Sequence, residues 1–371
     1  MKKSTNYISR QFSFWLLIFS LWLVAVFFDR LWWNFYSGIP SWDQADYLNS
    51  ALDHAKGLGF LDVSYGNGFK SLLDLSPKIP PLASIVNGAV LSIAGDSPAN
   101  AAWSLSIWHG LLIFSVAGWS LRVSGERLAY LSSFLICFTP SLFELRTDYV
   151  LEMAVISSTT LALWQLSILL ESHRNAEWKQ VFISALTCGS ALLVKQSSLL
   201  ILIPAISWLF VSFWGRGRIY KIKLIYFLLL VFIFVLPWVS HNWIMTIGGT
   251  HRAVLESAKI EGDPSLFTIN NWTYYLFLIP RQIGYSTFTL GISGCFYWLI
   301  INYKIVLTRI NQIYLYKNLQ GWEWVLYIIL SGWLFTTLIP NKNPRYIAAI
   351  LPPIIMIISG GCIQWLNIGM R

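Results

Sequence analysis

Apolar runs of about 17–25 residues recur along the chain and are separated by polar segments. A helix of this length crosses the roughly 30 Å hydrocarbon core of a bilayer. Each run is therefore predicted to form a transmembrane helix. The predicted spans are residues 12–28, 100–121, 128–145, 149–170, 179–194, 197–214, 222–240, 283–301, 324–340 and 345–366.

One further apolar segment, residues 82–95, is too short for a normal span and predicts an interfacial or re-entrant helix. The composition agrees with a membrane protein, because 56% of the residues are hydrophobic and only 12% are charged. Soluble domains carry about 25% charged residues. We therefore predict an all-α polytopic membrane protein with about ten transmembrane helices, and one membrane domain over residues 1–371.

The charge distribution predicts the orientation of the spans. With both termini in the cytoplasm, fifteen of the 26 Lys and Arg residues lie on the inner side, as the positive-inside rule requires. This distribution explains the net charge of +9 without a nucleic-acid partner. Two long loops, residues 29–99 and 241–282, then face the outside, where we expect the function to lie. The first of them is predicted to carry juxtamembrane helices.

Two residues of the first outer loop have side chains suited to chemistry. Asp43 follows the aromatic belt that ends the first span, and a partly desolvated carboxylate there suits a general base. The alternative is an ordinary helix cap. Lys78 precedes Pro80 and Pro81 at the start of the apolar segment. Its ammonium could bind a phosphate or simply snorkel from the interface.

Other charged residues are expected at the same outer boundary. Glu144, Asp148 and Glu152 are spaced by four residues, so they would share one face of a helix, and either serve a site or pair with Arg146. Cations that we also expect at this boundary are Lys195, Lys342 and Arg345. Cations and carboxylates gathered at one depth predict a site for an anionic amphiphile.

No sequence pattern identifies a cofactor. His54, His241 and His251 lack metal-ligand spacing, and no nucleotide-binding loop is present in the sequence. A divalent ion at Asp43 or Asp148 remains open.

Several short motifs together resemble the integral-membrane glycosyltransferases of the GT-C class, above all the glycosyltransferase family 39-like protein O-mannosyltransferases and lipid A aminoarabinose transferases. In this sequence Gln44 stands where the family has a second acid, and Ile79 separates Lys78 from its prolines. The matching elements are Asp43-Gln44-Ala45-Asp46-Tyr47, Lys78-Ile79-Pro80-Pro81-Leu82, Asp148, the helix ending in Lys195-Gln196, and Arg345-Tyr346 followed by Pro352-Pro353.

The resemblance implies transfer of a sugar from a polyprenyl-phosphate donor on the outer face of the membrane, by inverting displacement. Asp43 would then be the base, and Asp148 would orient the acceptor or a basic partner. Residues expected to bind substrate are Asp46, Tyr47, Lys78, Glu152, Lys195, Arg345 and Tyr346. The acceptor, a lipid, glycan or protein, is not identified by the motifs.

Two other classes of function stay open. A transporter or flippase of a lipid-linked sugar would need the same outer cations, although no inverted repeat is seen in the sequence. A structural membrane subunit is the other alternative, and it leaves the long outer loops unexplained. The expected location is the bacterial inner membrane.

Overall fold

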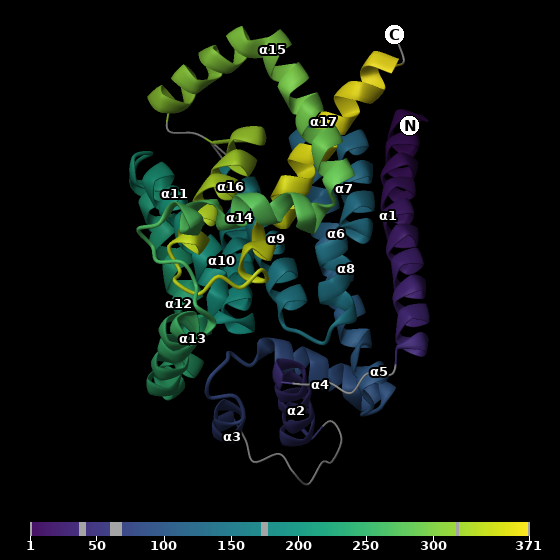
Figure 1. Ribbon diagram of the computed structural model, residues 1–371. Coiled ribbons are helices and arrows are strands. Elements are labelled where there is room, and N and C mark those ends of the chain that lie inside the picture. The colour runs from purple at the N-terminus through teal and green to yellow at the C-terminus, as the bar shows by residue number, and fades with distance from the viewer. Residues whose placement is uncertain (1, 37–41, 60–68, 172–176, 317–318, 370–371) are drawn as a thin grey trace.

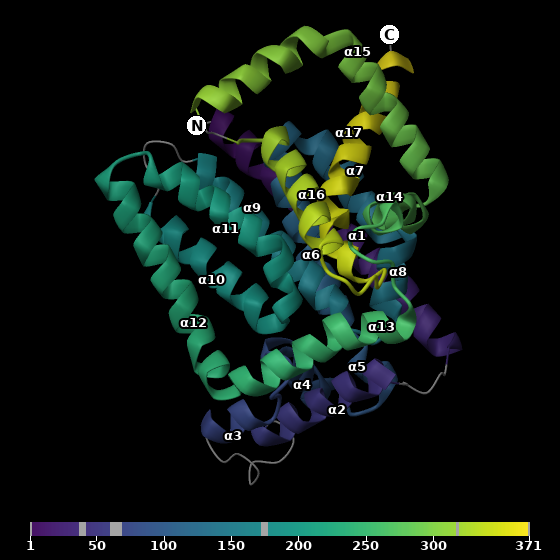
Figure 2. The ribbon, with the colours of Figure 1, turned by 60° about the vertical axis from the view of Figure 1, so that its left-hand side comes forward.

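The structure is a computed structural model that describes residues 2–36, 42–59, 69–171, 177–316 and 319–369, and every regular element in these ranges is helical. Long helices form a bundle, and four shorter ones lie together beneath one end of it (Figures 1 and 2). The all-α membrane fold is as predicted. The lower layer consists of α2 (Trp42–Gly57), α3 (Phe69–Asp74), α4 (Leu82–Ala94) and α5 (Pro98–Ala101).

The bundle contains the long apolar helices of the chain. Among the described residues, seven helices are long and apolar enough to cross a membrane, or eight if one bent pair is a single span. The bundle helices are α1 (Lys2–Phe35), α6 (Trp103–Ser124), α7 (Glu126–Phe138), α8 (Pro140–Thr147), α9 (Glu152–Glu171), α10 (Trp178–Val194), α11 (Leu199–Trp214), α12 (Arg218–His251), α14 (Ile269–Ile283), α15 (Tyr285–Tyr316), α16 (Trp322–Thr337) and α17 (Leu351–Gly369).

Two predicted spans, 179–194 and 324–340, correspond to the shorter helices α10 and α16, of 17 and 16 residues. Helix α10 nevertheless runs the length of α9. Gln180 near its start bonds to Gln165, and Lys195 just after its end pairs with Glu152, at the opposite end of α9. A helix of 17 residues covers about 25 Å, which is enough for this passage.

The predicted span 128–145 is not one straight helix. It is divided into α7 and α8, which are bent by 56° relative to each other. Pro140 is the first residue of α8 and lacks the N–H that would continue the hydrogen-bond ladder of α7. Asp148 directly follows Thr147, the last residue of α8, so its position depends on this bend.

The two long outer loops are largely helical. Residues 29–99 contain the end of α1 and all of α2–α5, as expected for juxtamembrane helices, and the segments 37–41 and 60–68 of this loop lie outside the described residues. Residues 241–282 are not an extended loop. Helix α12 continues to His251, followed by a π-helical turn over Arg252–Glu256, α13 (Ser257–Glu261) and α14. The predicted interfacial segment is the 13-residue α4, which packs on α2, where Gly88 meets the Ala51 carbonyl.

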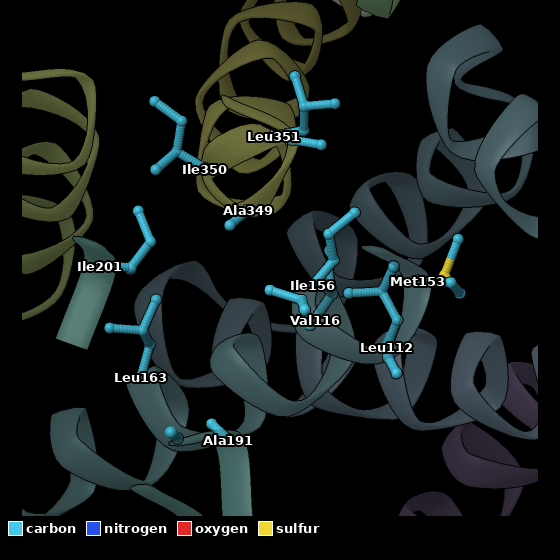
Figure 3. Close-up of a cluster of buried hydrophobic side chains, with 14 of the residues drawn as sticks. Leu112, Val116, Met153, Ile156, Leu163, Ala191, Ile201, Ala349, Ile350 and Leu351 are labelled. Atoms are coloured by element: carbon cyan, nitrogen blue, oxygen red, sulfur yellow. The ribbon is translucent and has the colours of Figure 1, made fainter. Parts of the chain in front are cut away.

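A large apolar core lies among α6, α9, α10, α11 and α17. Leu112 and Val116 of α6 face Ile156 of α9 within it (Figure 3). Lipid tails are as apolar as these side chains, so close van der Waals packing holds the helices together rather than escape from water. The helices need small residues wherever they approach each other most closely.

Helices α15 and α17 show this requirement most clearly. A side chain at Gly294 would collide with the backbone carbonyl of Gly361, and one at Gly361 with the carbonyl of Gly291. Backbone atoms cannot move aside as a flexible side chain can. These glycines therefore set the distance between the two helices.

We expect Gly294→Leu to destabilise the protein by about 1–3 kcal/mol, because overpacking forces α15 and α17 apart. The measurement is the midpoint of thermal unfolding in detergent, followed by tryptophan fluorescence. Gly248→Leu in α12 is the control, since nothing lies within 4 Å of the added carbon there. Equal midpoints for the two variants would contradict this account of the helix contact.

Candidate functional site

The first turn of α2 meets the segment that precedes α17. Asp43 lies in this turn, and its Oδ2 accepts a hydrogen bond from Nη2 of Arg345 at 3.0 Å. The Asn343 side chain holds Arg345 in place, because its Oδ1 accepts from the Arg345 backbone N–H at 2.9 Å and from Nε at 3.2 Å. The Asp43 side chain is 52% exposed, so this ion pair is accessible to a ligand.

A second ion pair lies behind the first. Lys195, just after α10, donates from Nζ to Oε1 of Glu152 at 2.6 Å. The other Glu152 oxygen lies 4.0 Å from Nη1 of Arg345. Arg345 therefore stands between two carboxylates, and the four side chains form a continuous row of alternating charge: Asp43, Arg345, Glu152 and Lys195. We call this row the charge relay cluster.

Two tyrosines complete the surroundings of this cluster. The Tyr47 ring centre lies 5.7 Å from Nζ of Lys195. Tyr346 lies close enough to Lys195 and Arg345 to interact electrostatically with both. Burial raises the pKa of Tyr47 above its usual value, and the nearby Lys195 ammonium only partly offsets this effect. Tyr47 is therefore a neutral hydroxyl at neutral pH.

The two cations of the cluster stay charged. Burial alone lowers the pKa of Lys195, but the Glu152 carboxylate, helped by Tyr47, raises it above the ordinary value. For Arg345, burial is likewise outweighed by Glu152 and Asp43, which raise its pKa. The stabilisation from these pairings is present at and below the usual lysine pKa and is lost only at a still higher pH. Near neutral pH, therefore, neither Lys195 nor Arg345 changes its protonation state.

Asp148 has a partner that the sequence did not indicate. Both of its oxygens accept from Nε2 of Gln44, at 2.8 and 3.0 Å. Gln44 is the residue that replaces the second acid of the family motif. Asp43 and Gln44 are adjacent in α2, so Asp148 lies beside the charge relay cluster without being part of it.

The prediction that Glu144, Asp148 and Glu152 share one helix face is wrong. Helix α8 ends at Thr147 and α9 begins at Glu152, and Asp148 between them has an extended backbone. Arg146 pairs with none of the three carboxylates. Its Nε donates instead to Asp29 of α1 at 2.8 Å, and both side chains are at most 3% exposed.

Lys78 and Asp46 lie at the exposed edge of the site. The loop that carries Lys78 is held by two contacts: Gln196 donates to the Lys78 carbonyl at 2.7 Å, and Trp238 of α12 donates to the Ser76 carbonyl at 3.0 Å. The Lys78 side chain is exposed and forms no ion pair with a described residue. Asp46 is exposed too, one turn along α2 from Asp43.

The segment that presents Arg345 is anchored by Lys342, which the sequence placed among the outer cations. Lys342 is instead buried. Its Nζ donates to the Thr337 carbonyl at 2.7 Å and to the Ile339 carbonyl, and its backbone N–H donates to Asp263 at 2.8 Å. Burial lowers the pKa of Lys342 to about 8, although Asp263 opposes the shift. Lys342 thus supports the site and does not face it.

Sequence reasoning missed three residues around the site: Gln44, Asn343 and Asp29. Gln44 follows Asp43, and Asn343 lies two residues before Arg345. A polar side chain next to or near a predicted site residue is the signal that could have found them. Asp29 could have been noticed as an acid inside an apolar run, a position that is costly without a partner. Its partner Arg146 is 117 positions away, a separation that no local pattern spans.

Metal ligands are a separate question. No group of three His, Cys, Asp or Glu residues within the described ranges is arranged to hold a metal ion. Asp43 and Asp148 are instead engaged with Arg345 and Gln44. We therefore assign no metal site at Asp43 and Asp148 and derive no chemistry from a metal ion.

Comparison with known proteins bears on the fold and on part of the sequence. Residues 78–241 match the dolichyl-phosphate-mannose-protein mannosyltransferase family. None of the curated proteins matches the chain. Among solved structures, ArnT from Cupriavidus metallidurans bound to undecaprenyl phosphate is similar with a TM-score of 0.62 and 14% identity, over 99% of this chain and 63% of that one. The apo state gives a TM-score of 0.61 and 15% identity over the same shares.

A more distant structure shares the fold. The archaeal oligosaccharyltransferase AglB from Archaeoglobus fulgidus, in complex with an inhibitory peptide and a dolichol-phosphate, gives a TM-score of 0.56 and 11% identity over 95% of this chain and 51% of that one. The chain thus spans less than two thirds of the length of these structures. The resemblance read from the motifs is confirmed: the fold is similar to that of the GT-C membrane enzymes ArnT and AglB, and residues 78–241 match the dolichyl-phosphate-mannose-protein mannosyltransferase family.

Proposed function

We propose that the protein transfers a sugar from a polyprenyl-phosphate donor to an acceptor hydroxyl at the membrane surface next to α2. The observation that carries this proposal is the Asp43–Arg345 ion pair, which sets an accessible carboxylate beside a guanidinium at the edge of the bundle. A carboxylate suits proton abstraction from a hydroxyl, and a guanidinium suits a phosphate. Group transfer from a lipid phosphate needs both at one place.

Donor binding would activate the base. In the structure Nη2 of Arg345 donates to Oδ2 of Asp43 at 3.0 Å, so this carboxylate oxygen is occupied. A phosphate arriving at Arg345 competes for the same N–H groups. Once Arg345 turns to the phosphate, the Asp43 carboxylate is free to accept a hydrogen bond from the acceptor hydroxyl. In this scheme Asp43 accepts a proton only when the donor is bound.

The transfer step follows from these positions. Asp43 takes the proton of the acceptor hydroxyl while that oxygen attacks the anomeric carbon, and the bond from this carbon to the phosphate oxygen breaks. The electron pair leaves with the polyprenyl phosphate, whose growing charge Arg345 and Lys78 stabilise. One displacement from the opposite face inverts the anomeric configuration.

Lys195 and Glu152 have a supporting part in this scheme. Because their ion pair is short and mostly buried, the positive charge of Lys195 is balanced by the Glu152 carboxylate before any ligand arrives. Glu152 in turn attracts Arg345 and limits how far the guanidinium can move. Tyr47, Tyr346 and Asp46 line the approach to the cluster. Asp148 and Gln44 lie where an acceptor hydroxyl would be oriented toward Asp43.

The relatives support the choice of donor. One similar structure holds undecaprenyl phosphate and another a dolichol-phosphate, and both are polyprenyl phosphates. The family match begins at Lys78, a predicted phosphate ligand. We infer that the site faces the outside of a bacterial inner membrane, with the N-terminal end of α1 and the C-terminal end of α17 on the cytoplasmic side. Both of these ends lie away from α2–α5 (Figure 1).

We expect Asp43→Asn to lower the rate of sugar transfer by at least 10²-fold while the donor still binds, because the amide cannot accept the proton. The assay uses the protein in nanodiscs with a panel of radiolabelled polyprenyl-phosphate sugars and follows release of the sugar. A folded Asp43→Asn protein with undiminished turnover would exclude Asp43 as the base. Movement of labelled donor across vesicles without release would favour a transporter instead.

We expect Lys78→Met to raise the KM for the donor about tenfold, the size of one charge-assisted contact to a phosphate, with a smaller change in kcat. Lys56→Met is the matched control, because Lys56 is an exposed lysine at the other end of α2. If both variants shift KM equally, Lys78 acts only through the general charge of the surface.

We expect Gln44→Glu to make transfer more sensitive to pH than in the wild type. A glutamate at this position faces Asp148 at hydrogen-bond distance, so one of the two carboxyls must hold a proton. The shared proton is present at low pH and is lost as the pH rises, and repulsion then separates the pair. The ratio of variant to wild-type activity should fall as the pH rises and the shared proton is lost, while Gln44→Leu should show a constant ratio.

A further inference from the structure

A cavity of about 500 Å³ lies between α1 and the bent pair α7–α8, and no residue of the charge relay cluster lines it. Its walls are apolar and largely aromatic. Phe28 and Trp32 of α1 face Phe138 and Phe143 of the bent pair, and Trp32 meets Phe143 edge to face with ring centres 5.5 Å apart. Phe28, Trp32 and Phe138 are also exposed, so the cavity opens toward the bilayer.

The cavity has a specific origin in the sequence. Because α8 leaves the line of α7 by 56° at Pro140, the two helices cannot both lie flat against α1. Pro140 itself lines the space that results. The cavity is therefore built into the backbone and does not depend on one side-chain rotamer.

One polar side chain, Arg146, also lines this apolar space. Arg146 is 3% exposed, and most of its donors are engaged: Nε donates to both Asp29 oxygens at 2.8 and 2.9 Å, and Nη1 donates to the Cys137 carbonyl at 2.6 Å. No described residue accepts a hydrogen bond from Nη2. Nη2 is not among the enclosed donors that lack a partner, so it is accessible from the cavity, and an acceptor from a ligand there would satisfy it.

The position and charge of this donor indicate what it would bind. The aromatic belt of Trp32, Trp33 and Tyr36 marks the level of the membrane interface, where the ester groups of lipids lie. The Arg146–Asp29 pair is neutral as a whole, so it has no net charge to attract a phosphate. A neutral carbonyl oxygen suits Nη2 best.

We propose that this cavity is a binding site for one membrane phospholipid, whose acyl chain lies between the aromatic walls and whose ester carbonyl accepts a hydrogen bond from Nη2 of Arg146. Arg146 precedes Asp148 by two residues. A bound lipid would therefore fill the space between α1 and α8 and steady the segment that carries Asp148. This site is independent of the sugar donor and holds whether or not the protein is a transferase.

The first test is photocrosslinking in nanodiscs with a phosphatidylcholine that carries a diazirine in its acyl chain. We expect crosslinked peptides from the end of α1 and from α7–α8, and at least fivefold less crosslinking in Leu31→Trp, which fills the cavity. Leu23→Trp is the matched control on the same helix. Leu23 is 46% exposed and does not line the cavity. Equal labelling of the wild type and both variants would overturn the proposal.

The second test uses only the wild-type protein and addresses the carbonyl. Unlabelled diester phosphatidylcholine should compete with the probe at least fivefold more strongly than the diether lipid of the same chain length, which lacks the carbonyl oxygen. Arg146→Lys, which retains a cation for Asp29 but loses Nη2, should abolish this preference. Equal competition by the diester and diether lipids would show that the cavity does not read the ester group, and would refute the proposed contact.

Discussion

Charged side chains at the edge of a bilayer have little water to solvate them, and the structure depends on how these charges satisfy one another. Removing an ion from water costs several kcal/mol, which only a well-placed partner and hydrogen bonds offset. The charge relay cluster meets this condition with two acids and two bases from four separate segments of the chain. Each charge of this cluster thus also joins separate segments of the bundle, so the proposed site and the assembly of the helices rest on the same contacts.

The ion pairs are not equivalent. Asp29 and Arg146 are fully buried and bound through two oxygens, which fixes α8 to α1. Asp43 and Arg345 lie nearer the surface, where an ion pair contributes little to stability and exchanges partners readily. The structure therefore combines a rigid anchor with a looser ion pair nearby: Arg146 lies two residues before Asp148, and Asp148 accepts hydrogen bonds from Gln44, the residue next to Asp43. This contrast is what a site that opens for a ligand needs.

Much of the fold could be predicted from apolar run lengths, because the bilayer imposes one length on every span. Four residues of the predicted site, Asp43, Glu152, Lys195 and Arg345, lie together in the structure. Their partners could not be predicted, since pairing depends on how helices pack. Arg146 bonds across to α1, Lys342 turns inward to the end of α16, and Asp148 leaves the helix altogether. Each outcome reflects a long-range contact or a proline bend that run lengths do not encode.

The Asp43–Arg345 contact joins residues that are 302 positions apart in the chain. A membrane protein is made from its N-terminus, and its helices enter the bilayer in order of synthesis. Asp43 is therefore displayed early, and the Glu152–Lys195 pair can form when α10 has followed α9. The guanidinium that completes the cluster arrives just before the last helix. A ribosome-bound chain that has not reached Arg345 holds every other charge of the cluster, so the order of translation itself leaves the row of alternating charge incomplete until the segment before α17 has been made.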